Sequence, residues 1–182
     1  MFKNTPVEQS NIEKAIKFLV TNFEKSGKNP KPVILHSIKT GMKLLDYGYD
    51  ENIIIAGILH DIIEDTDVEY NDIANAFNKE IADIVRSCSF DRNITDRFER
   101  GKELIGRCIA HGKDAVIVKI ADRLDTIEFQ KNLYKQNRND DFLNNLIIEH
   151  IYFLDRTETM MKHEEIWHEM NDKLNEYFKR KN

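Results

Sequence analysis

Proline, glycine and cysteine are scarce in this chain of 182 residues, with 3, 7 and 2 copies respectively. So few chain-breaking residues exclude a turn-rich β-sandwich and, with 41% hydrophobic and 32% charged residues, favour a folded helical chain over a disordered one. The two cysteines, Cys88 and Cys108, form no close pair. We therefore expect reduced thiols rather than a disulfide framework or a zinc site. The length suits one domain, spanning residues 1–182, with a hydrophobic core of its own.

The sequence also lacks a long apolar run and an excess of positive charge. Its longest apolar stretch, 53–59, is far shorter than the ~20 residues that cross a bilayer. The first residues contain no apolar segment typical of a signal peptide, so we expect a cytoplasmic protein with no membrane partner. The net charge is −5 and the pI about 5.7. Nucleic acid is therefore a poor candidate partner, because binding a phosphate backbone requires a basic surface.

Apolar residues recur with helical rather than alternating spacing, which predicts an all-α, single-domain helical bundle. A first helix should begin near Val7 or Asn11 and end near Gly27, followed by a proline-containing loop at 28–32. Further helices are predicted over 34–45, 53–65, 67–77, 79–88, 97–111, 141–162 and 164–179. The β-branched run 115–120 suits a strand as well as a helix. The two C-terminal segments are either bundle helices or the interface of a homo-oligomer.

The segment 53–66 carries the clearest signal of chemistry. At about 100° per residue, His60, Asp61, Glu64 and Asp65 share one arc of a helix. The turns before His60 are apolar on all sides, which is typical of a buried central helix. Buried carboxylates and imidazoles are costly unless they are paired or bind a metal, so this cluster predicts a metal site. The alternative is a solvent-exposed acidic face, which explains most isolated His-Asp pairs.

Two ligands rarely suffice to hold a metal ion, and the neighbouring helices offer more. His36 lies within the apolar pattern of the helix predicted before the cluster. Asp122 interrupts an apolar run in the segment 119–124, Lys-Ile-Ala-Asp-Arg-Leu. Each residue has a structural alternative: a hydrogen-bonded core histidine for His36, and an intrahelical ion pair with Lys119 or Arg123 for Asp122.

The order of these motifs resembles that of the HD-domain metal-dependent phosphohydrolases. The motifs are a lone histidine, His36, then the pair His60-Asp61 followed by Glu-Asp-Thr-Asp at 64–67, and then the segment 119–124. More narrowly, they are similar to the (p)ppGpp hydrolase domain of the RelA/SpoT family and its small stand-alone relatives. The resemblance extends over about residues 25–129. It implies an HD-type helical bundle in which the segment 115–120 is helical.

The resemblance also implies the roles of individual residues. His36, His60, Asp61 and Asp122 would bind the metal, usually manganese, and Glu64 and Asp65 would be the catalytic carboxylates. The implied reaction is hydrolysis of the 3′ pyrophosphate of guanosine tetra- or pentaphosphate, giving GDP or GTP. The implied substrate contacts are Lys25, Ser26, Lys119, Arg123 and Thr126, with ion pairing on the helix surface an equal alternative for Lys119 and Arg123.

The sequence departs from the family at the nucleotide contacts. It has Glu24-Lys25-Ser26-Gly27 where the family usually has Arg-Lys-Ser-Gly, and Asp125-Thr126 where the family tends to have His-Asn. The arginine that packs on guanine is therefore missing. Two alternatives stay open: a phosphohydrolase for another nucleotide, such as a deoxynucleotide (dNTP or dNMP) or NADPH, and a catalytically idle HD domain that binds a ligand or partner. The intact set of six metal-binding and catalytic residues argues against an idle domain.

Overall fold

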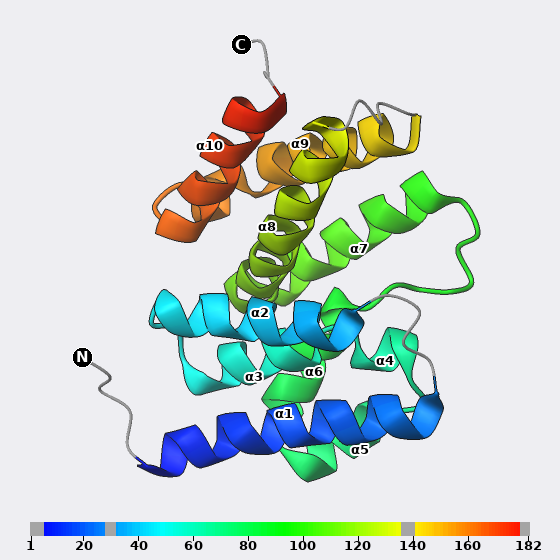
Figure 1. Ribbon diagram of the computed structural model, residues 1–182, viewed down its shortest axis with the longest axis vertical. Helices are drawn as coiled ribbons and strands as arrows, with labels where there is room; N and C mark the ends of the chain where they lie inside the picture. The colour runs from blue at the N-terminus through cyan, green and yellow to red at the C-terminus, as the bar shows by residue number, and fades with distance from the viewer. Residues whose placement is uncertain (1–5, 28–31, 136–140, 179–182) are drawn as a thin grey trace.

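The computed structural model describes residues 6–27, 32–135 and 141–178. These residues form helices joined by turns, with no strand among them (Figure 1). In chain order the helices are α1 (Pro6–Ser26), α2 (Val33–Asp46), α3 (Glu51–Leu59), α4 (Ile62–Asp65), α5 (Tyr70–Ala76), α6 (Lys79–Cys88), α7 (Arg97–His111), α8 (Lys113–Lys135), α9 (Asp141–Met161) and α10 (Glu165–Phe178). The prediction of an all-α helical bundle is confirmed.

Several helix ends follow directly from local sequence. The side chain of Asn78 accepts a hydrogen bond from the Ile81 N–H at the start of α6, and Asp96 caps α7 in the same way. Gly112 ends α7 with a φ of 129°, a conformation that suits glycine. These signals explain why α6 and α7 have the predicted bounds. The loop predicted at 28–32 lies outside the described residues except for Pro32.

Helix α8 is the central element of the molecule. It packs against α2, α3, α6, α7, α9 and α10, and in Figure 1 it runs from the middle of the molecule, beside α2, toward the end formed by α9 and α10. The ambiguous segment 115–120 lies inside α8, and each of its side chains is buried. Helical neighbours surround the segment, so its apolar residues are buried without a sheet, and the helix implied by the family resemblance is confirmed.

The single helix predicted over 53–65 is wrong at one point. α3 ends at Leu59 and α4 begins at Ile62, with a turn at His60-Asp61 between them. The cause is local: Nδ1 of His60 donates to the Gly57 carbonyl at 2.8 Å. In a continuous helix that carbonyl would accept the backbone N–H of Asp61, so the side chain competes with the helical hydrogen bond. The turn therefore lies at the two residues that carry the His-Asp motif.

Helices α2 and α3 cross closely because each has a glycine at the contact. A Cβ atom at Gly41 would overlap the Ile58 side chain, and one at Gly57 would overlap Leu44. This close approach brings His36 on α2 beside His60, with 5.1 Å between the centres of the two rings.

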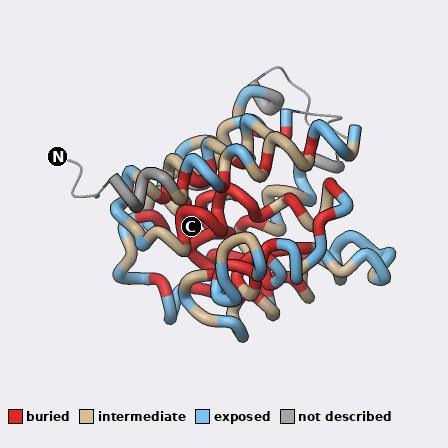
Figure 2. Tube along the Cα trace, turned by 90° about the horizontal axis from the view of Figure 1, so that it is seen from below, coloured by how far each residue is buried: buried red, intermediate tan, exposed pale blue. Residues whose placement is uncertain are grey.

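Buried residues gather in the middle of the molecule, with exposed positions around them (Figure 2). None of the described helices is long and apolar enough to span a membrane. Cys88 and Cys108 are free, buried thiols in this core. The Cys88 thiol donates to the Ala115 carbonyl, and the Cys108 thiol donates to the Ser87 carbonyl. The helices that carry them, α6 and α7, pack against each other.

Candidate metal centre and active site

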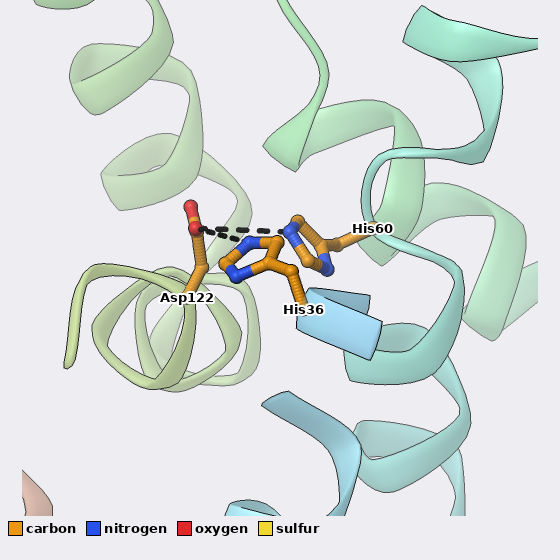
Figure 3. A group of neighbouring side chains, drawn as sticks. All are labelled: His36, His60 and Asp122. Atoms are coloured by element: carbon orange, nitrogen blue, oxygen red, sulfur yellow. Dashed lines mark hydrogen bonds and ion pairs between the residues drawn. The ribbon is translucent and has the colours of Figure 1, made fainter. Parts of the chain in front are cut away.

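Three separate elements bring histidine and aspartate side chains to one point. His36 comes from α2, His60 from the turn after α3 and Asp122 from α8, and Figure 3 shows the three side chains pointing toward one another. Nε2 of His36 lies 3.1 Å from Oδ1 of Asp122, and Nε2 of His60 lies 3.7 Å from the same oxygen. One ligand atom from each of the three lies within 4.8 Å of the others, a spacing that could hold a metal ion.

Asp61 lies at the edge of this group. Its Oδ1 is 3.2 Å from Nε2 of His60, and its Oδ2 is 3.8 Å from Nε2 of His36. The structure therefore brings together all four residues that the family resemblance implied as metal ligands.

The surroundings of His60 test whether a cation fits. The ring is fully buried, and because Nδ1 donates to the Gly57 carbonyl, Nε2 carries the lone pair in the neutral imidazole. Nε2 has no hydrogen-bond partner, although it faces the carboxylates of Asp61 and Asp122. A buried lone pair directed at two carboxylates is unfavourable unless a proton or a metal cation lies between them. Burial lowers the pKa of His60, but Asp61 and Asp122 raise it, so this position favours positive charge. Two imidazole nitrogens with two carboxylates fit a divalent transition metal.

Asp125 was missed as a site residue by the sequence analysis. Its Oδ2 lies 2.8 Å from Nδ1 of His36, while its Oδ1 accepts a hydrogen bond from Lys39 at 3.2 Å. Burial alone would lower the pKa of His36, but the hydrogen bonds to Asp122 and Asp125 raise it to about 10. Helical spacing held a signal for this contact, because Asp125 follows Asp122 by three residues and so shares its face of α8.

Lys119 is buried and forms an ion pair with Asp122, with 2.8 Å between Nζ and Oδ2. Its ammonium also donates to the Cys88 carbonyl. Burial disfavours the charged form of each residue, but the attraction between the two opposite charges is stronger. The pKa of Lys119 is therefore raised, and that of Asp122 is held well below its usual range. The structure thus favours the ion-pair alternative for Lys119 and leaves Asp122 ionised.

Glu64 and Asp65 follow the turn on the short helix α4. Oε1 of Glu64 accepts the backbone N–H of Phe90 at 2.8 Å. Burial raises the pKa of Glu64 to about 7, although the charge of Lys119 opposes this shift. A carboxyl group with a pKa near neutrality can both accept and release a proton. Asp65 is half-buried, and its backbone N–H bonds to the Asp61 carbonyl, one turn before it.

The predicted substrate contacts are dispersed. Arg123 is buried and directed at α9, where it donates to Nδ1 of His150 at 2.9 Å, so the structure does not support a phosphate contact for it. The Thr126 hydroxyl donates to the backbone carbonyl of Asp122. Lys25 and Ser26 line a cavity of about 570 Å³ between α1 and α5 that includes none of the four candidate ligands.

Comparison with known proteins finds relatives of similar sequence. A guanosine-3′,5′-bis(diphosphate) 3′-pyrophosphohydrolase of Aquifex aeolicus is 28% identical over 131 residues, which are 70% of this chain and 19% of that protein. The Drosophila melanogaster enzyme of the same name, MESH1, is 30% identical over 97 residues, which are 51% of this chain and 54% of that protein. The chain thus spans about a fifth of the first relative and about half of the second.

Solved structures share the fold. One, described as a metazoan orthologue of SpoT that hydrolyses ppGpp, superposes with a TM-score of 0.74 and 18% identity over 99% of this chain and 98% of that chain. A Listeria monocytogenes protein superposes with a TM-score of 0.67 and 21% identity over 79% of this chain and 95% of that chain. The HD domain family itself matches residues 15–145, which include every candidate ligand and both candidate catalytic carboxylates. The chain belongs to the HD domain family.

Proposed function

We propose that this protein is a metal-dependent phosphohydrolase that removes the 3′ pyrophosphate of guanosine tetra- or pentaphosphate, leaving GDP or GTP. The observation that carries this proposal is the convergence of His36, His60, Asp61 and Asp122 at one point, with the partnerless Nε2 of His60 facing two carboxylates. The names of the Aquifex and Drosophila relatives support the choice of substrate.

These four residues would hold one divalent ion, and we propose manganese. Mixed nitrogen and oxygen ligands suit a borderline first-row metal and disfavour a closed structural zinc site. When bound, such an ion lowers the pKa of a water molecule and polarises a phosphoryl oxygen.

The protein groups supply the proton chemistry. Glu64, with its pKa near neutrality and one oxygen fixed by the Phe90 N–H, would accept a proton from the attacking water. Asp65, next to it on α4, would orient that water. Attack at the phosphorus bonded to O3′ breaks the P–O3′ bond, the water oxygen leaves in pyrophosphate, and O3′ receives a proton. Lys119 neutralises Asp122, so that less negative charge faces the phosphates.

Guanine recognition should be weaker than in a typical family member. Glu24 stands where the family has the arginine that packs on guanine, and Thr126 uses its hydroxyl on a backbone carbonyl. Each lost polar contact is worth roughly 1–3 kcal/mol. Such losses relax the preference for a base without removing the hydrolytic groups.

The test is a panel of nucleotides incubated with the protein and Mn²⁺ and scored for both pyrophosphate and orthophosphate. The panel contains ppGpp, pppGpp, the adenine counterpart of ppGpp, NADPH, dNTPs and dNMPs. We expect pyrophosphate from ppGpp and pppGpp, with modest discrimination against the adenine counterpart. Cleavage confined to substrates without a 3′ pyrophosphate would overturn the alarmone assignment but leave a phosphohydrolase. No cleavage of any nucleotide by the metal-loaded protein would favour the idle-domain alternative.

A further inference from the structure

Each of three candidate ligands is held in place by a second group. The Gly57 carbonyl holds Nδ1 of His60, and the ammonium of Lys119 holds Oδ2 of Asp122. The corresponding partner of His36 is Asp125, whose Oδ2 lies 2.8 Å from Nδ1. None of the sequence motifs assigned Asp125 a role, and it stands at a position where the chain departs from its family.

The position of Asp125 couples it to the metal centre. It lies one helical turn after Asp122 on α8, so one face of this helix provides a candidate ligand and the partner of another ligand. Because α2 and α8 pack together, Asp125 reaches the side of the His36 ring opposite Nε2. Its second oxygen is held by Lys39, the ammonium of which is 3.2 Å away.

We propose that Asp125 is a positioning residue for the metal centre. By accepting the Nδ1–H of His36, its carboxylate fixes the ring orientation and the tautomer in which the Nε2 lone pair is available to a metal. A carboxylate on the outer nitrogen of a ligating histidine also makes that histidine a stronger ligand, and losing such a partner typically weakens metal binding about 10- to 100-fold. This inference rests on the metal centre of the proposed function but not on the identity of the substrate.

Lys39 offers an internal control. More than half of its side chain is exposed, at 56%, and its ammonium pairs with Asp125. Replacing Lys39 removes an ion pair at the surface, where such pairs contribute little. If Asp125 acts through His36, its own replacement should weaken metal binding, whereas Lys39→Met should not.

The experiment measures the dissociation constant of Mn²⁺ for the protein of 182 residues by calorimetric titration. Asp125→Asn keeps an acceptor but loses the charge, and we expect about 10-fold weaker binding; Asp125→Ala loses both, and we expect a loss toward 100-fold. Lys39→Met and Asp83→Asn should bind within about threefold of the parent. Asp83 is a matched control because it is a partly buried aspartate that accepts a hydrogen bond, from Tyr70, and is not one of the candidate site residues.

A purely structural role for Asp125 gives a different result. It would lower the thermal stability of the metal-free protein without changing the visible absorption spectrum of the Co²⁺-loaded protein, which reports ligand geometry. We expect that spectrum to change in Asp125→Asn and to stay unchanged in Lys39→Met.

The outcomes separate this inference from the proposed function. Parent-like Mn²⁺ affinity in both Asp125 variants would overturn the inference, and so would an equal loss in Lys39→Met. A parent protein that does not bind Mn²⁺ would overturn the inference and the metal centre together. If the Asp125 variants lose affinity as expected but the parent cleaves no nucleotide, the inference stands and the proposed reaction falls.

Discussion

Neighbouring charged residues on α8 serve separate parts of the molecule. Asp122 faces the two histidines, whereas Arg123, the next residue, is buried against His150 of α9. Consecutive residues on a helix point about 100° apart, so they meet different neighbours. In the sequence, Asp122 and Arg123 together interrupt an apolar run. The helices packed around α8 decide that Asp122 belongs to the site and that Arg123 does not.

At the same scale, Glu64→Gln and Asp65→Asn test the catalytic pair. Each amide keeps the shape of the carboxylate but cannot accept a proton. We expect both variants to bind Mn²⁺ like the parent and to lose turnover by about 10² to 10⁴-fold. Initial rates on ppGpp measure the loss, and Glu13→Gln, at an exposed position of α1, is the control. Parent-like rates in both variants would show that these carboxylates have no catalytic role.

At the scale of elements, the crossing of α2 and α3 depends on glycine. Gly41→Val would place its side chain against Ile58, and overpacking of this kind costs about 1–3 kcal/mol. Gly106 on α7 is the matched control, because it is exposed and a Cβ there has no neighbour within 4 Å. Gly106→Val should be neutral or slightly stabilising, because valine favours a helix more than glycine does. Urea unfolding measures both, and equal effects would show that the crossing tolerates a side chain.

The contact between α8 and α9 should carry a pH dependence. Burial and the charge of Arg123 hold the pKa of His150 well below 6.5, and the neutral ring accepts from Arg123 and donates to Gln130. Below about pH 6.5 the unfolded chain therefore binds a proton that the folded protein does not, so the stability contributed by this group falls as pH falls.

His150→Gln isolates this effect because glutamine can make the same two hydrogen bonds without titrating. Between pH 7.5 and 5.5 the parent should lose about 1.4 kcal/mol of unfolding free energy relative to this variant, the value of one pH unit below the unfolded pKa. Denaturant titrations at the two pH values measure the difference. A difference that does not change with pH would mean that His150 binds a proton equally well in the folded and the unfolded protein.

At the scale of the whole molecule, a metal at the candidate centre would link α2, the turn between α3 and α4, and α8. These elements are separated in sequence, so the complete ligand set exists only in the folded protein, and binding should stabilise it. At a Mn²⁺ concentration 100 times the dissociation constant, the gain is about 2.7 kcal/mol, or a rise in Tm of roughly 5–10 °C. Thermal unfolding with and without Mn²⁺ measures it, and excess chelator should reverse it.

Asp122→Asn provides the control for this stabilisation. The variant keeps the shape of the side chain but loses the charge that faces both histidines, so Mn²⁺ should no longer raise its Tm by a comparable amount. An equal rise in parent and variant would place the bound metal elsewhere on the protein.

Sequence alone was enough for features that depend on local patterns. Helical spacing of apolar residues predicted the all-α class and the ranges 79–88 and 97–111, which match α6 and α7. The His60-Asp61 motif, with His36 and Asp122, indicated four residues that the fold then brings together. Such features are set by the chemistry of a few adjacent side chains or by the helical repeat, so they need no knowledge of distant contacts.

Tertiary structure decided the rest. The contact of Asp125 with His36, the burial of Arg123 against α9 and the hydrogen bond from the Cys108 thiol to the Ser87 carbonyl all join residues from different helices. Which residues meet in such contacts depends on how each helix is rotated about its axis and on how closely neighbouring helices, such as α2 and α3, approach each other. That rotation and that distance are set by the packing of the whole core, which no short stretch of sequence contains.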